Sequence, residues 1–130
     1  MLHEIALRRA LPGIVKTYDF SGKWKNELGS IVTLDQEGGK VMGTYTSPVS
    51  EPGRPVTGAV IGYVTGMGIV FSVQWTGLQS MTSWVGQLVP VRIGETIIPT
   101  LQALWQMVSS VHPGDEWAAI NAGADVFTRP

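Results

Sequence analysis

The stretch DFSGKWKNELGSIVTLDQEGGKVMGTYTS, residues 19–47, decides the fold. Its first part alternates between two kinds of side chain, as a half-buried strand does. Charged residues occupy odd positions, whereas the even positions hold Phe20, Gly22, Trp24, Asn26, Leu28 and Ser30. We therefore expect the even face to point inward. Asn26 and Ser30 would then be polar groups in an apolar lining, where they need hydrogen-bonding partners.

The second half of this stretch repeats the pattern after Gly38 and Gly39. Here the odd positions share a face, which carries Val41, Gly43, Tyr45 and Ser47. A lining that combines aromatic rings with a few placed hydrogen-bonding groups is typical of small-molecule pockets. The two halves together predict strands that surround such a pocket.

The composition agrees with a small β protein. The chain has 130 residues, 44% of them hydrophobic, with sixteen glycines and eight prolines. This length suits one compact domain, and the abundance of turn residues beside Val, Thr, Ile and Trp favours short strands over helices. We expect an all-β fold, an eight-stranded antiparallel up-and-down barrel over residues 19–130, after an N-terminal extension, residues 1–18.

Several classes of function are excluded by the same numbers. The formal net charge is -1 without a basic run, so we expect no nucleic-acid partner. Without cysteine the chain has no disulfide and no thiolate metal site. No apolar run approaches the roughly 20 residues that span a bilayer, so we expect no membrane partner and a soluble protein. His3 and His112 lie outside the inward pattern, so neither a metal site nor catalysis is predicted.

The first 18 residues precede the strand pattern. The sequence MLHEIALRRALPG allows one or two helical turns before Pro12 and Gly13 end them. It does not read as a secretory signal, because its apolar core is short and Arg8 and Arg9 follow that core. We expect a disordered or surface-docked extension, and a role in assembly is the alternative.

The middle of the chain alternates between strands and turns. Residues 48–55, PVSEPGRP, predict a loop of about eight residues that is long for a hairpin and lies near the barrel mouth. Residues 56–64 alternate with glycines on one face, and Gly66-Met67-Gly68 predicts a hairpin turn. In the next strand Phe71, Val73 and Trp75 share a face.

The C-terminal third repeats the mixed lining. After a short connection at residues 76–79, one face carries Ser80, Thr82, Trp84, Gly86 and Leu88. Residues 95–108 could form a helix, but we interpret them as a strand with Leu101, Ala103, Trp105 and Met107 inward. In the last strand Gly123, Asp125 and Phe127 would face inward. The outward apolar positions predict a subunit contact made by Leu104, Val108, Ala122, Ala124 and Val126.

Seven ordered motifs resemble the avidin and streptavidin family. They are GKWKNELGS, GTYTS, VQW, SMTSWVGQ, ALWQM, DEW and AGADVFTR, and the resemblance covers residues 20–130. The Gly-x-Trp pattern at residues 22–24 alone is shared with lipocalins, whereas the full order of motifs with its later tryptophans is specific. The resemblance implies an eight-stranded barrel that binds biotin, usually as a homotetramer. It also implies a secreted protein that is not an enzyme and needs no cofactor.

The resemblance assigns a role to each matching position. Asn26, Ser30 and Tyr45 would donate to the ureido oxygen of biotin, and Asp125 and Ser47 would accept from its two N–H groups. Thr82 would face the thioether sulfur. The apolar walls would be Trp75, Trp84, Trp105 and Met107, and the valerate carboxylate would meet Ser80 and the backbone near Val49. Trp117 would reach a neighbouring subunit's site, while Trp24 would plug the barrel floor.

Two other functions fit part of the pattern. A lipocalin-like carrier of an apolar ligand would share the barrel, but it does not explain four inward polar groups. An enzyme could use Asp125 with Tyr45 as an acid–base pair, but an inward His or Cys and a nucleophile motif are missing. The chain also departs from the family at Glu51, whose carboxylate would lie near that of the ligand.

Overall fold

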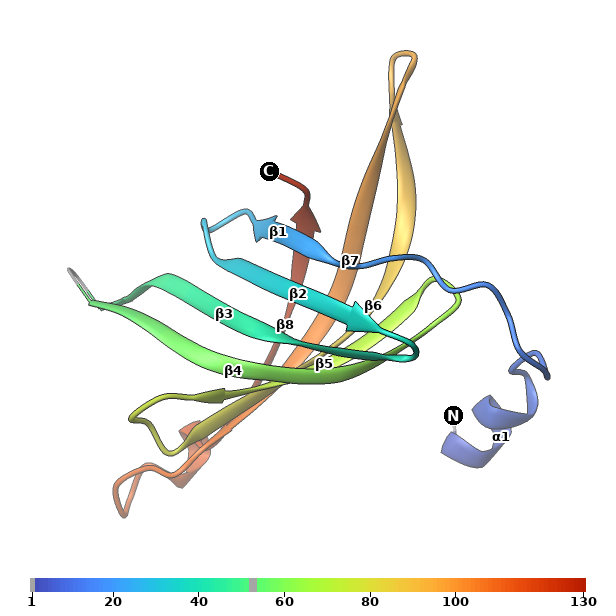
Figure 1. Ribbon diagram of the computed structural model, residues 1–130. Coiled ribbons are helices and arrows are strands. Elements are labelled where there is room, and N and C mark those ends of the chain that lie inside the picture. Colours follow the sequence, from blue (N-terminus) through green and yellow to red (C-terminus); the bar gives the residue numbers. More distant parts are fainter. Residues whose placement is uncertain (1, 52–53) are drawn as a thin grey trace.

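The computed structural model describes residues 2–51 and 54–130, with residues 49–51 described by their backbone alone (Figure 1). Eight strands follow one another around a closed barrel in which every neighbouring pair is antiparallel. The strands are β1 (Gly22–Asn26), β2 (Ile31–Glu37), β3 (Lys40–Glu51), β4 (Arg54–Thr65), β5 (Gly68–Trp75), β6 (Ser80–Ile93), β7 (Thr96–Ser109) and β8 (Ile120–Thr128). The predicted all-β up-and-down barrel is confirmed.

The core lies inside the barrel and follows the predicted alternation. In β4 every second residue from Gly58 to Val64 is buried, while the residues between them are exposed. The same period buries Phe71 and Val73 in β5 and Leu101 and Ala103 in β7. Residues 95–108 belong to the β6–β7 hairpin and β7, so the strand interpretation is correct. A strand period of two therefore fills the interior with one face of each strand.

Trp24 closes one end of the barrel. Its side chain is fully buried, and its indole Nε1–H donates to the carbonyl oxygen of Phe20 at 2.9 Å. The guanidinium carbon of Arg129 lies 4.2 Å from the centre of a Trp24 ring, a cation–π distance. Arg129 also donates to the carbonyl oxygens of Asp19 and Ser21, which ties the C-terminus to the start of the barrel. Trp24 thus occupies the position at the barrel floor that was predicted for it.

The predicted loop at residues 48–55 is wrong in length. Strand β3 continues to Glu51, which pairs with Arg54 at the start of β4. The pairing register shifts between Ser47 and Glu51, so Pro48 lies in an irregular part of the ladder where its missing N–H costs little. Residues 52 and 53 lie outside the described residues. Strands β3 and β4 are therefore longer than the prolines in the sequence suggested.

The N-terminal segment is anchored at the floor end of the barrel. It begins with a short helix, α1 (His3–Arg8), none of whose residues is buried. Tyr18 N–H donates to the carbonyl oxygen of Gly66 at 2.8 Å, and the Thr17 hydroxyl accepts from Gly66 N–H at 3.3 Å. The boundary between an N-terminal extension (residues 1–18) and the barrel domain remains a prediction. Tyr18, on the extension side of this boundary, packs against the barrel core. Within residues 2–51 and 54–130, no helix has the length and apolarity to cross a membrane.

Gly43 marks a place where two strands come too close for a side chain. A Cβ added there would overlap the carbonyl oxygen of Thr33 on β2, whereas a Cβ at Gly39 would meet only the Val64 carbonyl oxygen at 3.7 Å. We expect Gly43→Ala to lower the free energy of unfolding by about 1–3 kcal/mol, because the backbone has to move. Urea denaturation measures this, with Gly39→Ala as the matched control. Equal stability of the two variants would contradict the close approach.

Candidate ligand-binding site

A cavity of about 270 Å³ is lined by side chains from seven of the strands, β1 and β3 to β8, and from the turns between them. Its volume is near the lower end of small-molecule sites. Eleven of the thirteen residues predicted from the sequence line it, together with three that were not predicted. The lining residues are Asn26, Leu28, Ser30, Tyr45, Ser47, Val56, Trp75, Leu78, Ser80, Thr82, Trp84, Trp105, Met107 and Asp125. The fold therefore brings predicted residues from strands that are far apart in the sequence to one cavity.

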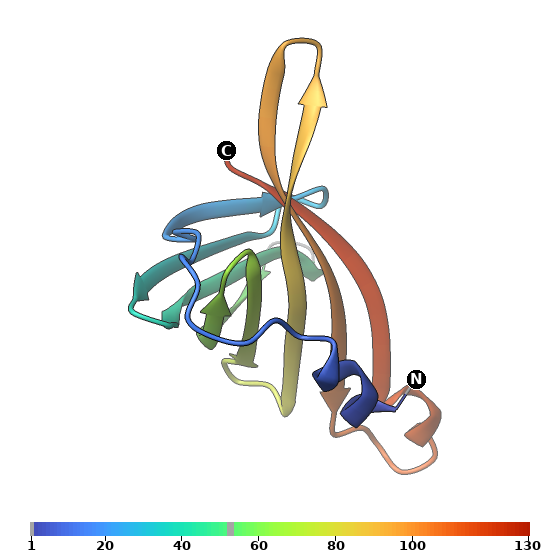
Figure 2. The ribbon, with the colours of Figure 1, turned by 90° about the vertical axis from the view of Figure 1, so that its right-hand side faces the viewer.

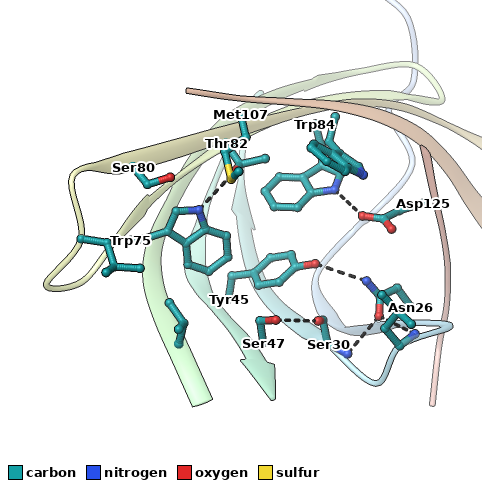
Figure 3. A pocket seen from close by; sticks show the side chains of 14 residues that line it. Asn26, Ser30, Tyr45, Ser47, Trp75, Ser80, Thr82, Trp84, Met107 and Asp125 are labelled. Carbon is teal, nitrogen blue, oxygen red and sulfur yellow. Dashed lines mark hydrogen bonds between the residues drawn. The ribbon is translucent and has the colours of Figure 1, made fainter. Parts of the chain in front are cut away.

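Asn26 presents its amide nitrogen to the cavity because its oxygen is already engaged. The Oδ1 atom accepts from the backbone N–H groups of Leu28 at 3.1 Å and Ser30 at 2.9 Å (Figure 3). These two bonds hold the β1–β2 turn, in which Gly29 has a φ of +86°. An amide whose oxygen takes two N–H groups must direct Nδ2 the other way, and this atom lies 3.4 Å from the Tyr45 hydroxyl. Asn26 is thus a fixed donor.

The hydroxyl groups of Ser30, Ser47 and Tyr45 lie next to Asn26. Ser30 Oγ donates to Ser47 Oγ at 3.3 Å, a long bond that a ligand could replace. The pKa of Tyr45 is raised above its ordinary value, first because the ring is buried and second because Asp125 is near. The phenol therefore keeps its proton and can donate it to an acceptor in the cavity.

Asp125 faces these donors from β8. Its side chain is 9% exposed, and its Oδ2 accepts the indole N–H of Trp84 at 2.8 Å. Burial raises the pKa of Asp125 above its ordinary value, and the nearby Glu27 carboxylate adds to this, while hydrogen bonds from Trp84 and Asn26 act in the opposite direction. Asp125 is thus a buried acid bonded to a tryptophan N–H. The carboxylate can still accept from a ligand, because each of its oxygens has two lone pairs.

Aromatic rings form the rest of the wall. Tyr45 stacks on Trp84 with ring centres 4.8 Å apart and meets the edge of Trp75 at 5.3 Å. The indole N–H of Trp75 donates to Thr82 Oγ1 at 3.0 Å, which fixes the ring (Figure 3). Beside Trp105, a Cβ on Gly123 would lie 2.5 Å from the indole, so glycine makes room for this ring. The wall is therefore apolar and rigid, whereas the hydrogen-bonding groups gather at one end.

Three aliphatic residues of the lining were missed, namely Leu28, Val56 and Leu78. Leu28 was expected on the inward face of a strand, but β1 ends at Asn26 and Leu28 lies in the following turn with 61% of its surface exposed. Leu78 is in the β5–β6 turn and is 54% exposed. Strand alternation gives no information about turns, so Leu28 and Leu78 could be identified only by knowing which turns surround the opening. Val56 lies in β4 on the same face as Gly58 and Val60, but it was not predicted as a site residue.

One predicted site residue with a described side chain, Trp117, is not among the residues that line the cavity. Trp117 belongs to a 3-10 turn, η1 (Glu116–Ala118), and is 83% exposed. The side chains of Val49 and Glu51 lie outside the described residues. Ser80, at the cavity edge, shares a 2.7 Å hydrogen bond with the Ser109 hydroxyl. In the described part of the chain no three His, Cys, Asp or Glu side chains gather as a metal site would need.

A profile of the avidin family matches residues 14–130. The chain belongs to the avidin family. Avidin of Gallus gallus is 30% identical to it over 140 residues, covering 99% of this chain and 90% of avidin. Avidin-related protein 4/5 of the same species is 32% identical over 117 residues, which cover 84% of this chain and 76% of the relative.

Solved structures lead to the same family. Xenavidin superimposes on this avidin-family chain with a TM-score of 0.73 at 29% identity, covering 88% of this chain and all of xenavidin. A biotin binding protein from chicken gives a TM-score of 0.71 at 27% identity, with 86% and 96% covered. Family membership also confirms the prediction that this protein is not an enzyme.

Proposed function

We propose that the protein binds one biotin molecule per chain in the cavity at the open end of the barrel. The observation that carries the proposal is the opposition of a fixed donor, Asn26 Nδ2, and a buried acceptor, Asp125, across one small apolar cavity. A ureido group needs both, because its oxygen accepts and its nitrogens donate. A biotin binding protein from chicken shares the fold at 27% identity, which supports the same ligand here.

The polar end of the cavity would hold the ureido head. Asn26 Nδ2, the Tyr45 hydroxyl and the Ser30 hydroxyl would donate to the ureido oxygen. Ser30 would give up its long bond to Ser47, whose oxygen then accepts one ureido N–H while Asp125 accepts the other. Donors aimed in advance at a single oxygen stabilise the negative charge that builds up on it.

The remaining lining would hold the apolar part of biotin. Trp75, Trp84 and Trp105 would cover the ring system, with Met107 beside them. The Thr82 oxygen accepts from Trp75, so its hydroxyl proton can turn toward the thioether sulfur. Ser80 and the backbone near Val49 would meet the acid end. Asp125 is the one charged residue among the described lining residues, so the ligand's acid would find no cation there.

A lipocalin-like carrier of an apolar ligand fits the cavity less well. Such a ligand would cover Asn26, Ser30, Ser47 and Asp125 without replacing their hydrogen bonds to water. Each buried polar group left without a partner costs about 1–3 kcal/mol. The grouping of polar atoms at one end therefore favours a polar-headed ligand.

A fluorescence titration tests the proposal, because three of the five tryptophans line the cavity. Added biotin should change the emission and saturate at one ligand per chain. Valeric acid, which shares the acid tail but lacks the ureido head, serves as the control and should leave the emission unchanged at the same concentrations. An emission that biotin leaves unchanged, with calorimetry also silent, would refute the proposal.

The proposal includes a pH dependence that follows from Asp125. Its pKa is raised in the folded protein, and the ionised form accepts a ureido N–H more strongly than the protonated form does. Biotin affinity should therefore fall, by up to about tenfold per pH unit, below this raised pKa, starting at a higher pH than an ordinary aspartate would give. The stability of the free protein should change with pH in the opposite direction. Ionised Asp125 is less favourable in the folded chain than in the unfolded chain. This group therefore lowers the free energy of unfolding as the pH rises. Calorimetry across pH should show the binding effect for the natural chain and its absence for Asp125→Asn.

We also propose a homotetramer in which Trp117 enters a neighbouring subunit's site, and secretion of the protein, both on family membership. The exposure of Trp117 in the single chain is compatible with such a contact. Trp117→Lys should weaken both biotin binding and subunit association, because a charge would replace an apolar contact. Calorimetry and sedimentation velocity measure the two effects. If neither changes, Trp117 lies away from any subunit contact.

A further inference from the structure

Met107 differs from the other methionines that the structure describes. Met42, Met67 and Met81 lie on the outside of the protein, where they are 62%, 52% and 54% exposed. Met107 is partly buried, and among the described methionines it alone lines the cavity. Because the alternation of β7 turns its side chain inward, solvent reaches the Met107 sulfur through the ligand-binding site.

The neighbour of Met107 across the sheet is Thr82. Strands β6 and β7 lie side by side (Figure 2), and their register places Thr82 directly opposite Met107. The side chains of such a pair share a face of the sheet, with their Cβ atoms about 4.5–5.5 Å apart. Both line the cavity, and Figure 3 shows them together on its wall. An atom added to the Met107 sulfur would therefore stand next to the Thr82 hydroxyl.

The Thr82 hydroxyl has a proton to donate to such an atom. Its oxygen already accepts the indole N–H of Trp75 at 3.0 Å, so its own O–H points elsewhere. A thioether sulfur is a weak acceptor, whereas a sulfoxide is polar and its oxygen accepts hydrogen bonds. Oxidised Met107 would thus take the proton that the proposed function directs toward the thioether of biotin.

We propose that Met107 is a modification site, at which hydrogen peroxide oxidises the thioether to a sulfoxide in the empty cavity and thereby weakens ligand binding. The sulfur loses two electrons and gains one oxygen atom from the peroxide, which is reduced to water. Bound biotin would cover Met107 and keep the oxidant away from it. The inference rests on the proposed function, because the affinity that falls is the affinity for biotin.

The added oxygen acts against binding in two ways. It takes up room in a cavity of about 270 Å³, a volume near the lower end of small-molecule sites. It also places a polar group in the wall that Trp75, Trp84 and Trp105 form, and a ligand that covers this group removes water from it. The affinity for biotin should therefore fall at least about tenfold.

Peroxide treatment of the ligand-free protein tests the site. Peptide mass spectrometry should find a sulfoxide at Met107 as well as at the exposed Met42, Met67 and Met81. Bound dethiobiotin, which keeps the ureido head but has no sulfur of its own to oxidise, should protect Met107 and leave the other three unprotected. These three residues are therefore internal controls in each sample. A Met107 that stays reduced in the empty protein, or that oxidises equally fast with the ligand bound, would overturn the inference.

Calorimetry after removal of the peroxide measures the effect on affinity. The oxidised natural chain should bind biotin at least about tenfold more weakly than the untreated chain, and the two methionine sulfoxide reductases, one for each epimer, should restore the affinity. Met107→Leu cannot form a sulfoxide and should bind equally before and after treatment. Met81→Leu is the matched control, since it removes an exposed methionine of β6 and should lose affinity as the natural chain does.

Two results of this calorimetry would overturn the inference. One is an unchanged affinity of the natural chain with Met107 oxidised. The other is an equal loss in Met107→Leu, because a different group would then be responsible. The untreated natural chain reports on the proposed function separately, since its failure to bind biotin would refute that function whatever the pattern of oxidation.

Discussion

Replacing Asp125 with alanine is expected to weaken biotin binding by at least about 1–3 kcal/mol, the cost of leaving a buried hydrogen-bonding group without its partner. The change leaves one ureido N–H unpaired, and it also frees the Trp84 indole N–H, which Asp125 holds at 2.8 Å. Calorimetry measures the loss. Asp125→Asn is the matched control, because it keeps one acceptor oxygen and should lose less. An alanine variant with natural affinity would remove Asp125 from the site.

Replacing Trp24 with alanine should lower the free energy of unfolding by about 3–5 kcal/mol, as expected when a large buried aromatic side chain is removed. The ring is fully buried at the barrel floor, touches Phe20 and Tyr18, and carries the Arg129 guanidinium. Urea denaturation measures the loss, and Trp24→Phe should lose less because it keeps a ring. A loss below about 1 kcal/mol in the alanine variant would show that the floor does not depend on this side chain.

The fold could be predicted from the sequence because the interior of a barrel is filled by alternate residues of each strand. Phe71, Val73 and Leu101 are buried where the alternation placed them. The prolines near residue 50 were misleading, since the general rule ends a strand at proline. Pro48 is instead accommodated by a register shift between Ser47 and Glu51. Local irregularities of this kind depend on the partner strand, which a sequence pattern does not contain.

The cavity lining could be predicted in part for the same reason. Strand residues such as Tyr45 and Asp125 face inward by their period, and the family motifs identified them as a set. The orientation of the Asn26 amide could not be predicted, because it depends on the N–H groups of Leu28 and Ser30 in the turn. The hydrogen bond between Trp84 and Asp125 joins residues 41 positions apart and arises only when the barrel closes.

Several groups of the cavity are oriented before any ligand enters. Asn26, Trp75 and Asp125 each have a protein partner that fixes them, whereas the 3.3 Å bond from Ser30 to Ser47 can exchange for ligand contacts. Groups that are already ordered lose little conformational entropy on binding. The geometry therefore suits a rigid ligand with a polar head.

A crystal structure of the protein with biotin tests the central claim most directly. The account predicts the ureido oxygen within hydrogen-bonding distance of Asn26 Nδ2 and the Tyr45 hydroxyl, and a ureido nitrogen against the Asp125 carboxylate, with the bicyclic ring between Trp75 and Trp105. Biotin bound elsewhere, or bound in the cavity with its ureido head turned away from Asn26 and Asp125, would contradict it.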